Sequence, residues 1–100
     1  MDMQTMLNED LLTAIQRRNF DMVKSLISQG ADVNYATMNG NSPLTFAVCS
    51  GDMEIIKFLL QKGADPNKKN RAIGGGENSA VTFARYIVKN ERLATFLEYY

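Results

Sequence analysis

Apolar residues recur along this chain in short groups that have the spacing of amphipathic helices. In one kind of group they occupy positions i, i+3 and i+4, which share one face of a helix. This spacing is found at Leu11, Ala14 and Ile15, and again at Leu44, Ala47 and Val48. In the other kind, adjacent pairs recur one turn later: Met22/Val23 with Leu26/Ile27, and Ile55/Ile56 with Leu59/Leu60. The pattern predicts pairs of short helices that cover one another's apolar faces.

Polar residues and glycines indicate where these helices begin and end. Ser42 followed by Pro43 is typical of a helix N-cap with proline at the first helical position, where its missing N–H costs nothing. Residues suited to cap the second helices are Asn19 and Asp52, and those suited to end them in a left-handed conformation are Gly30 and Gly63. The Ala-Asp-x-Asn that follows each glycine favours a turn.

The helix–turn–helix unit repeats along the chain. GADVN at 30–34 returns as GADPN at 63–67, an offset of 33 positions, and the helices before the two copies also align. In a third, weaker copy, SPLTFA at 42–47 reappears as SAVTFA at 79–84, now 37 positions on. The added length falls around Gly74, Gly75 and Gly76. Because periods of about 20 to 50 residues are typical of solenoids, we expect a stack of three units.

These features resemble the ankyrin repeat from about Asn8 to Tyr100. GNSPLTFA at 40–47 is similar to the family's G-x-T-P-L-H-x-A, and residues 51–67 follow its second helix and GAD turn. The resemblance implies an all-α ankyrin-repeat solenoid of three helix-turn-helix units with short finger turns. We expect one domain over residues 1–100, with repeats at about 7–36, 37–69 and 70–100.

The sequence departs from the family's pattern at three positions. The usual histidine is Thr45 in the middle copy and Thr82 in the last, and Glu9 stands at the Ser/Thr position of the first copy. The loss of histidine removes some hydrogen bonding between repeats but leaves the stack intact.

The third copy carries charge where the first two are apolar. At the offset of that copy, Arg85 stands at the position of Ile15 and Val48, and Arg92 at that of Met22 and Ile55. The end units of a solenoid need a polar outer surface. We therefore expect the stack to end here and the chain to be complete.

Charge and cysteine content bear on partners and location. Eleven basic residues balance eleven acidic ones, so the chain has no net field that would gather nucleic acid or an anionic membrane. Cys49 is the only cysteine, and the first ten residues carry acidic side chains where a signal peptide has basic ones before an apolar run. No apolar run approaches the roughly 20 residues that cross a bilayer. We expect a cytoplasmic protein.

Few residues are candidates for catalysis. The chain has no histidine, the commonest general base and a common zinc ligand. Gly74–Gly76 lacks the G-x-x-x-x-G-K-[ST] pattern of a phosphate-binding loop, and Cys49 has no histidine to activate it. Asp32, Asp52 and Asp65 belong to predicted turns and caps. We expect no enzymatic activity, no metal and no cofactor.

The resemblance also implies where a partner binds, because ankyrin partners usually meet the fingertips and the exposed positions of the first helices. Carried onto this sequence, the implied partner-binding residues are Gln16, Arg17, Tyr35, Met38, Asn39, Asn41, Cys49, Ser50, Lys69, Arg71, Tyr86 and Ile87. Tyrosine, methionine and arginine are enriched at such contacts. Two alternatives are core packing for Ile87, and a cover over the hinge between units for Tyr35 and Met38.

The predicted function is a non-catalytic protein-binding module, an inhibitor, immunity-like factor or adaptor that is monomeric when free. One alternative is nucleic-acid or nucleotide binding through Lys68, Lys69 and Arg71 with a stacking tyrosine, which predicts an affinity that falls steeply with salt. Another is structural self-association through the exposed apolar residues of the end repeats. The neutral net charge counts against the nucleic-acid hypothesis.

Overall fold

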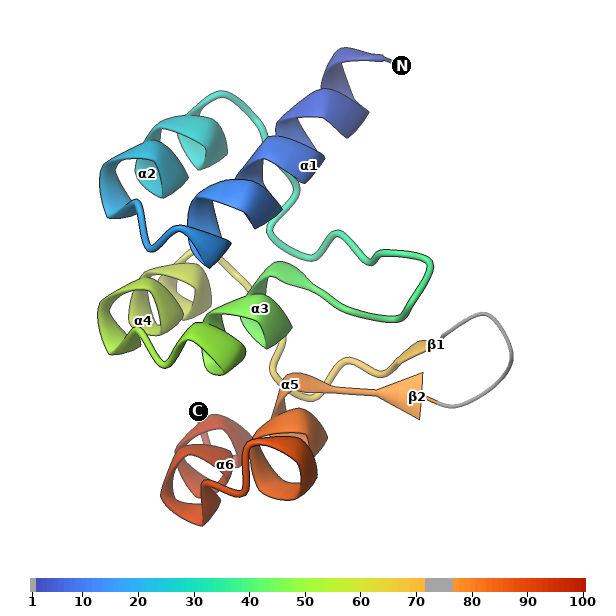
Figure 1. The fold of residues 1–100 in the computed structure, drawn as a ribbon, viewed down its shortest axis with the longest axis vertical. Helices are drawn as coiled ribbons and strands as arrows, with labels where there is room; N and C mark the ends of the chain where they lie inside the picture. Colours follow the sequence, from blue (N-terminus) through green and yellow to red (C-terminus); the bar gives the residue numbers. More distant parts are fainter. Residues whose placement is uncertain (1, 72–76) are drawn as a thin grey trace.

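Pairs of helices stack on one another in the order of the sequence (Figure 1). In the computed structural model, which describes residues 2–71 and 77–100, the first pair is α1 (Met3–Gln16) with α2 (Phe20–Ser28). The other pairs are α3 (Pro43–Ser50) with α4 (Met53–Gln61), and α5 (Ala80–Thr82), continued by the π-helix η1 (Phe83–Ile87), with α6 (Glu91–Glu98). The predicted all-α solenoid of helix pairs is confirmed.

The helices begin at the caps that the sequence predicts. The side chain of Ser42 accepts the N–H of Thr45 at 3.2 Å, and that of Asp52 accepts the N–H groups of Glu54 and Ile55. In the first repeat α1 starts earlier than the repeat pattern indicates, because Asp2 caps it. The N–H of Thr5 donates to this carboxylate and lowers the pKa of Asp2. Gly30 and Gly63 end the second helices at φ of 108° and 97°.

The predicted apolar faces form one continuous core between the helix pairs. Among the side chains with no exposed surface are those of Leu11, Ile15, Val23, Ile55, Ile56 and Leu59. Met22 is an exception with 47% of its surface exposed, because its face of the first repeat has no neighbouring pair. The core therefore depends on stacking, as expected of a solenoid.

Asparagine side chains join the turns of successive repeats. The side-chain carbonyl of Asn34 accepts the N–H of Asp65 at 3.0 Å, and its NH₂ donates to the carbonyl of Gly63 at 3.0 Å. At the first turn two side chains of α1 make the equivalent contacts: Asn8 accepts the N–H of Asp32 at 2.7 Å, and Gln4 donates to the carbonyl of Gly30 at 3.0 Å. The asparagine of the GADVN motif is therefore an inter-repeat contact as well as a turn residue.

The third repeat contains one residue more than the middle repeat between its two caps. Ser42 and Asp52 are ten residues apart, whereas Ser79 and Asn90, which cap α5 and α6, are eleven apart. The extra residue is taken up by η1, where the N–H of Val88 donates to the carbonyl of Phe83, five residues back. Such single-turn π-bulges preserve the helix on either side of an insertion.

This bulge corrects the alignment of the third copy. Counted from the caps, Leu93 and not Arg92 is the equivalent of Ile55, and Leu93 is buried in the core. The prediction that Arg92 replaces Ile55 is wrong by one residue, because the 37-residue offset does not hold beyond η1.

Charged groups cover the face of the third helix pair that points away from the middle repeat. Arg85 donates from Nε to the carboxylate of Glu91 at 3.1 Å and from Nη1 to Glu98 at 3.4 Å. The hydrogen bond to Glu91 makes the largest contribution to a raised pKa of Arg85, and that to Glu98 adds to it, so the guanidinium stays positively charged. The polar end surface is therefore an ion-pair network.

Two fingers project to the same side of the helices (Figure 1). The first joins α2 to α3, and the second contains the strands β1 (Asn70–Arg71) and β2 (Glu77–Asn78), which pair antiparallel. The sequence did not predict these strands. The insertion at Gly74–Gly76 lies outside the described residues.

Candidate functional site

A cleft of about 400 Å³ lies between the first finger and the first helices of two repeats, and is called the finger cleft below. It is lined by Glu9, Leu12, Thr13, Gln16, Tyr35, Thr37, Met38, Asn39 and Phe46. These residues come from α1, from the first finger and from α3. The cleft is therefore a property of the stack and is absent from any isolated repeat.

A tight turn forms the finger wall of this cleft. The N–H of Thr37 donates to the carbonyl of Asn41 at 2.8 Å, and the N–H of Gly40 donates to the carbonyl of Thr37 at 2.9 Å. Gly40 is buried with a φ of 78°, a left-handed conformation that favours glycine. This turn places Met38 and Asn39 at the fingertip, where Met38 is 73% exposed.

The helical wall is one stripe of α1. Glu9, Leu12, Thr13 and Gln16 recur at three- and four-residue spacing and so share a face of the helix. Leu12 from this stripe and the half-buried Phe46 of α3 provide apolar surface, whereas Glu9 and Gln16 are exposed. The cleft thus combines an apolar floor with a polar rim.

Four of the predicted partner-binding residues come together here, namely Gln16, Tyr35, Met38 and Asn39. The sequence reasoning missed Glu9, Leu12, Thr13, Thr37 and Phe46. The helical period counted back from Gln16 could have found the residues on α1. Phe46 carried no such signal, because its position in the motif is variable.

Other predicted residues lie away from the finger cleft. Asn41 holds the base of the finger, where its N–H donates to the hydroxyl of Thr37. The hydroxyl of Ser50 is directed back to the helix and donates to the carbonyl of Phe46 at 3.1 Å. Cys49 is exposed on α3, and desolvation raises the pKa of its thiol, which makes it a weaker nucleophile at neutral pH.

The remaining predicted residues belong to the second finger and the third repeat. Lys69 and Arg71 are exposed, and Arg71 forms an ion pair with Glu77 at 3.6 Å. Tyr86 and Ile87, on η1, are 67% and 63% exposed. The alternative that Ile87 packs in the core is therefore wrong. Neither group lines the finger cleft.

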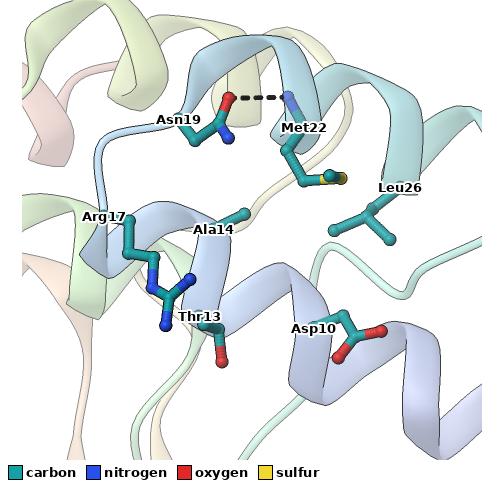
Figure 2. Close-up of a pocket in the computed structure, with 7 residues that line it drawn as sticks. All are labelled: Asp10, Thr13, Ala14, Arg17, Asn19, Met22 and Leu26. Carbon is teal, nitrogen blue, oxygen red and sulfur yellow. Dashed lines mark hydrogen bonds between the residues drawn. The ribbon is translucent and has the colours of Figure 1, made fainter.

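A second cleft, of about 210 Å³, lies at the N-terminal end of the stack between α1 and α2 and is called the end cleft (Figure 2). It is lined by Asp10, Thr13, Ala14, Arg17, Asn19, Met22 and Leu26. Arg17, predicted to meet the partner with Gln16, points to this end instead. Asn19 is engaged as a cap, since its side chain accepts the N–H of Met22 at 3.1 Å.

Comparison with known proteins identifies the family. The family model of ankyrin repeats (3 copies) matches residues 4–70. The chain belongs to the ankyrin-repeat family. This ankyrin chain is 36% identical over 77 residues to the ankyrin repeat and KH domain-containing protein mask-1 of Caenorhabditis elegans, which covers 76% of the chain. It is 38% identical over 58 residues, 58% of the chain, to the potassium channel AKT1 of Arabidopsis thaliana.

The ankyrin chain corresponds to a small part of these relatives. It spans 3% of mask-1 and 7% of the potassium channel. A third relative, the ankyrin repeat domain-containing protein oryK of Aspergillus oryzae, is 36% identical over 72 residues, which are 67% of the chain and 12% of that protein. The shared part is the repeat itself.

Ankyrin repeats are generally protein-interaction modules, and the repeat domain is typically non-catalytic. In residues 2–71 and 77–100 no three His, Cys, Asp or Glu side chains are grouped so as to hold a metal ion. None of the helices in the same ranges is both long and apolar enough to span a bilayer.

Proposed function

We propose that this chain is a non-catalytic ankyrin module that binds a partner protein in the finger cleft and acts as an inhibitor or adaptor. The observation that carries this proposal is the convergence of Gln16, Tyr35, Met38 and Asn39 on one cleft with an apolar floor. Tyrosine and methionine in a hollow surrounded by polar side chains are typical of the centre of a protein contact.

The cleft favours a partner segment with one apolar anchor. Leu12 and Phe46 offer the floor on which such a side chain packs, and Tyr35 and Met38 can close over it from the finger. Glu9 on the rim favours a basic residue beside the anchor. A loop or turn of the partner that carries an apolar residue next to lysine or arginine meets these requirements.

The mode of action follows from rigidity. The two walls are helices and a hydrogen-bonded turn, so binding orders few additional groups. A preformed surface of this kind blocks or bridges its target by occupying it. The balanced charge and the single cysteine support a cytoplasmic setting.

The second finger supports nucleic-acid binding less well. Arg71 is engaged with Glu77, and Lys68 lies 3.5 Å from the carbonyl of Asn34, so part of the basic group is already used within the fold. Retention on nucleic acid that falls steeply with salt would favour this second candidate.

Matched substitutions test the proposal. In affinity capture from native lysate, Met38→Asp and Gln16→Arg are expected to reduce the retained protein at least about tenfold, the effect of losing a central contact. The controls are Met53→Asp and Gln61→Arg, which make the same changes at exposed positions of α4 away from the cleft. Equal retention by the cleft variants and the control variants would contradict the proposal.

A further inference from the structure

The two ends of the stack differ in the side chains that they expose. In the middle repeat, Ala47, Ile55 and Leu59 are fully buried because the first repeat covers them. Their equivalents in the first repeat, 33 positions earlier, are Ala14, Met22 and Leu26, which line the end cleft. Ala14 and Leu26 are buried within the first helix pair, whereas Met22 is 47% exposed, so Met22 is the part of this stacking surface that lacks a cover.

An exposed stripe extends this surface along α1. Met3, Met6, Asp10, Thr13 and Arg17 follow one another at three- and four-residue spacing and share one face of the helix. Met3 is 70% and Met6 46% exposed. Methionine is suited to such contacts, because its unbranched side chain adapts to the surface that it meets.

The charges of the end cleft are arranged in a self-complementary way. Asp10 and Arg17 lie at opposite ends of the cleft, with Thr13 and Ala14 between them (Figure 2). They are two helical turns apart, about 10.5 Å along the axis. Within the described residues neither takes part in an ion pair.

A two-fold axis beside Thr13 and Ala14 would exploit this arrangement. If α1 of a second copy packs antiparallel across the cleft, Asp10 of each copy faces Arg17 of the other. On the same alignment Met6 reaches the α1–α2 turn of the second copy, near its Met22. Two exposed methionines, Met6 and Met22, and two charges of each copy then gain partners.

We propose that the end cleft is a self-association surface, through which two copies of this chain pack N-terminal end to N-terminal end about a two-fold axis. The free chain is then a weak dimer, in contrast to the monomer expected from the sequence. The finger cleft stays open in this dimer apart from the shared edge at Thr13, because Glu9 and Gln16 lie on another face of α1. The dimer does not depend on the function proposed above.

The opposite end of the stack does not offer an alternative contact of this kind. There Arg85 and Glu98 stand where the middle repeat has the buried Val48 and Leu60. Arg85 is already paired with Glu91 and Glu98 within the same chain. Head-to-tail stacking on this end would bury these charges, which costs more than their pairing returns.

Sedimentation of the full chain tests the proposal over about 10 μM to about 1 mM, since a small interface associates weakly. The parent is expected to shift from monomer to dimer. Asp10→Arg alone and Arg17→Asp alone each place like charges across two symmetric contacts, and we expect dimerisation to weaken at least about tenfold. Glu9→Arg reverses the neighbouring carboxylate, on the finger-cleft face, and is expected to leave the dimer unchanged.

Recombining the variants distinguishes the two-fold arrangement from any other. The double variant D10R/R17D is expected to dimerise like the parent, and an equal mixture of D10R with R17D is expected to form a one-to-one heterodimer. Circular dichroism of each variant verifies that the helices are intact. Should a variant unfold, Thr13→Cys in a Cys49→Ser background provides a second test, because a residue beside the two-fold axis is expected to form a disulfide-linked dimer on oxidation.

Several outcomes would overturn the proposal. They are a parent that stays monomeric throughout the range, a mixture of D10R and R17D that does not associate, and growth beyond the dimer, which indicates head-to-tail stacking. Capture of a foreign helical protein by the end cleft of a monomeric parent would assign the surface to another occupant. A parent that does not dimerise but still captures its partner rejects this inference and leaves the proposed function standing.

Discussion

Three residues with positive φ precede the caps of the second helices, namely Arg18, Gly51 and Lys89, at 55°, 70° and 60°. The left-handed conformation costs a residue with a Cβ about 1 kcal/mol and glycine almost nothing. Arg18 compensates, because its guanidinium donates to the carbonyl of Ser50 in the next repeat. Lys89 has no side-chain hydrogen bond to a described residue.

Replacing Lys89 by glycine is therefore expected to stabilise the chain by about 0.5 kcal/mol, the strain relieved less the flexibility added to the unfolded chain. Arg18→Gly is expected to give no gain, because it also removes the contact with Ser50. Urea unfolding of both variants measures the difference. A K89G variant less stable than the parent would show that Lys89 has a contact of its own.

Ser42 caps α3 from a buried position and also hydrogen-bonds to the hydroxyl of Thr45 at 3.0 Å. This pair stands where the family has threonine and histidine. Ser42→Ala is expected to lower the free energy of unfolding by about 1–2 kcal/mol, since it leaves the N–H of Thr45 without its acceptor. Ser28→Ala, at the exposed end of α2, is the control, with a change below about 0.5 kcal/mol.

At the scale of elements, η1 is the segment that distinguishes the third repeat. Tyr86 and Ile87 of this segment point outward, both more than 60% exposed, while Ala84 in the same segment is fully buried. A π-bulge of this kind can lose its inserted residue without disturbing the helix on either side.

Deleting Ile87 is accordingly expected to leave a folded chain, with α5 and η1 merged into one regular helix and the two caps ten residues apart, as in the middle repeat. Deleting Cys49, also exposed but in a helix without a spare residue, is expected to unfold the middle repeat, because it rotates Ser50 by about 100° and shortens the connection from α3 to α4 by one residue. Circular dichroism during thermal unfolding compares the two deletions. Similar losses in both would contradict the assignment of the extra residue to η1.

The sequence predicted most of the elements because the signals that define them are local. Caps such as Ser42 and Asp52 and the apolar spacing around Leu59 depend on neighbouring residues in the chain. The short β1–β2 pairing and the π-bulge depend on contacts and chain length that no local pattern carries. Asn90 caps α6 and fixes its register, which is one position later than the motif alignment predicted.

The candidate site was predictable only in part for a related reason. Motif positions indicate that Met38 and Asn39 occupy a fingertip, but the opposite wall depends on how α1 rotates against α3. That rotation brings Leu12 and Phe46 into the finger cleft and turns Arg17 to the end of the stack.

At the scale of the whole molecule, the ion pairs of Arg85 with Glu91 and Glu98 keep the C-terminal end of the stack from packing on another copy. The double substitution R85V/E98L restores the apolar residues that the middle repeat has at Val48 and Leu60. We expect light scattering to show species larger than a dimer that grow with concentration, because a newly apolar end stacks without closing. Arg85→Lys keeps the charge and is the control. A double variant that scatters like the parent would assign the closure to other residues.

A solenoid with paired charges at only its C-terminal end can gain repeats more easily at its N-terminal end. A helix pair fused ahead of α1 would meet the exposed side chain of Met22, whereas one fused behind α6 would meet Arg85 already paired with Glu91 and Glu98. Gene duplication could therefore extend such an array from its front by a single recombination. Extension from its rear would require at least two further point mutations.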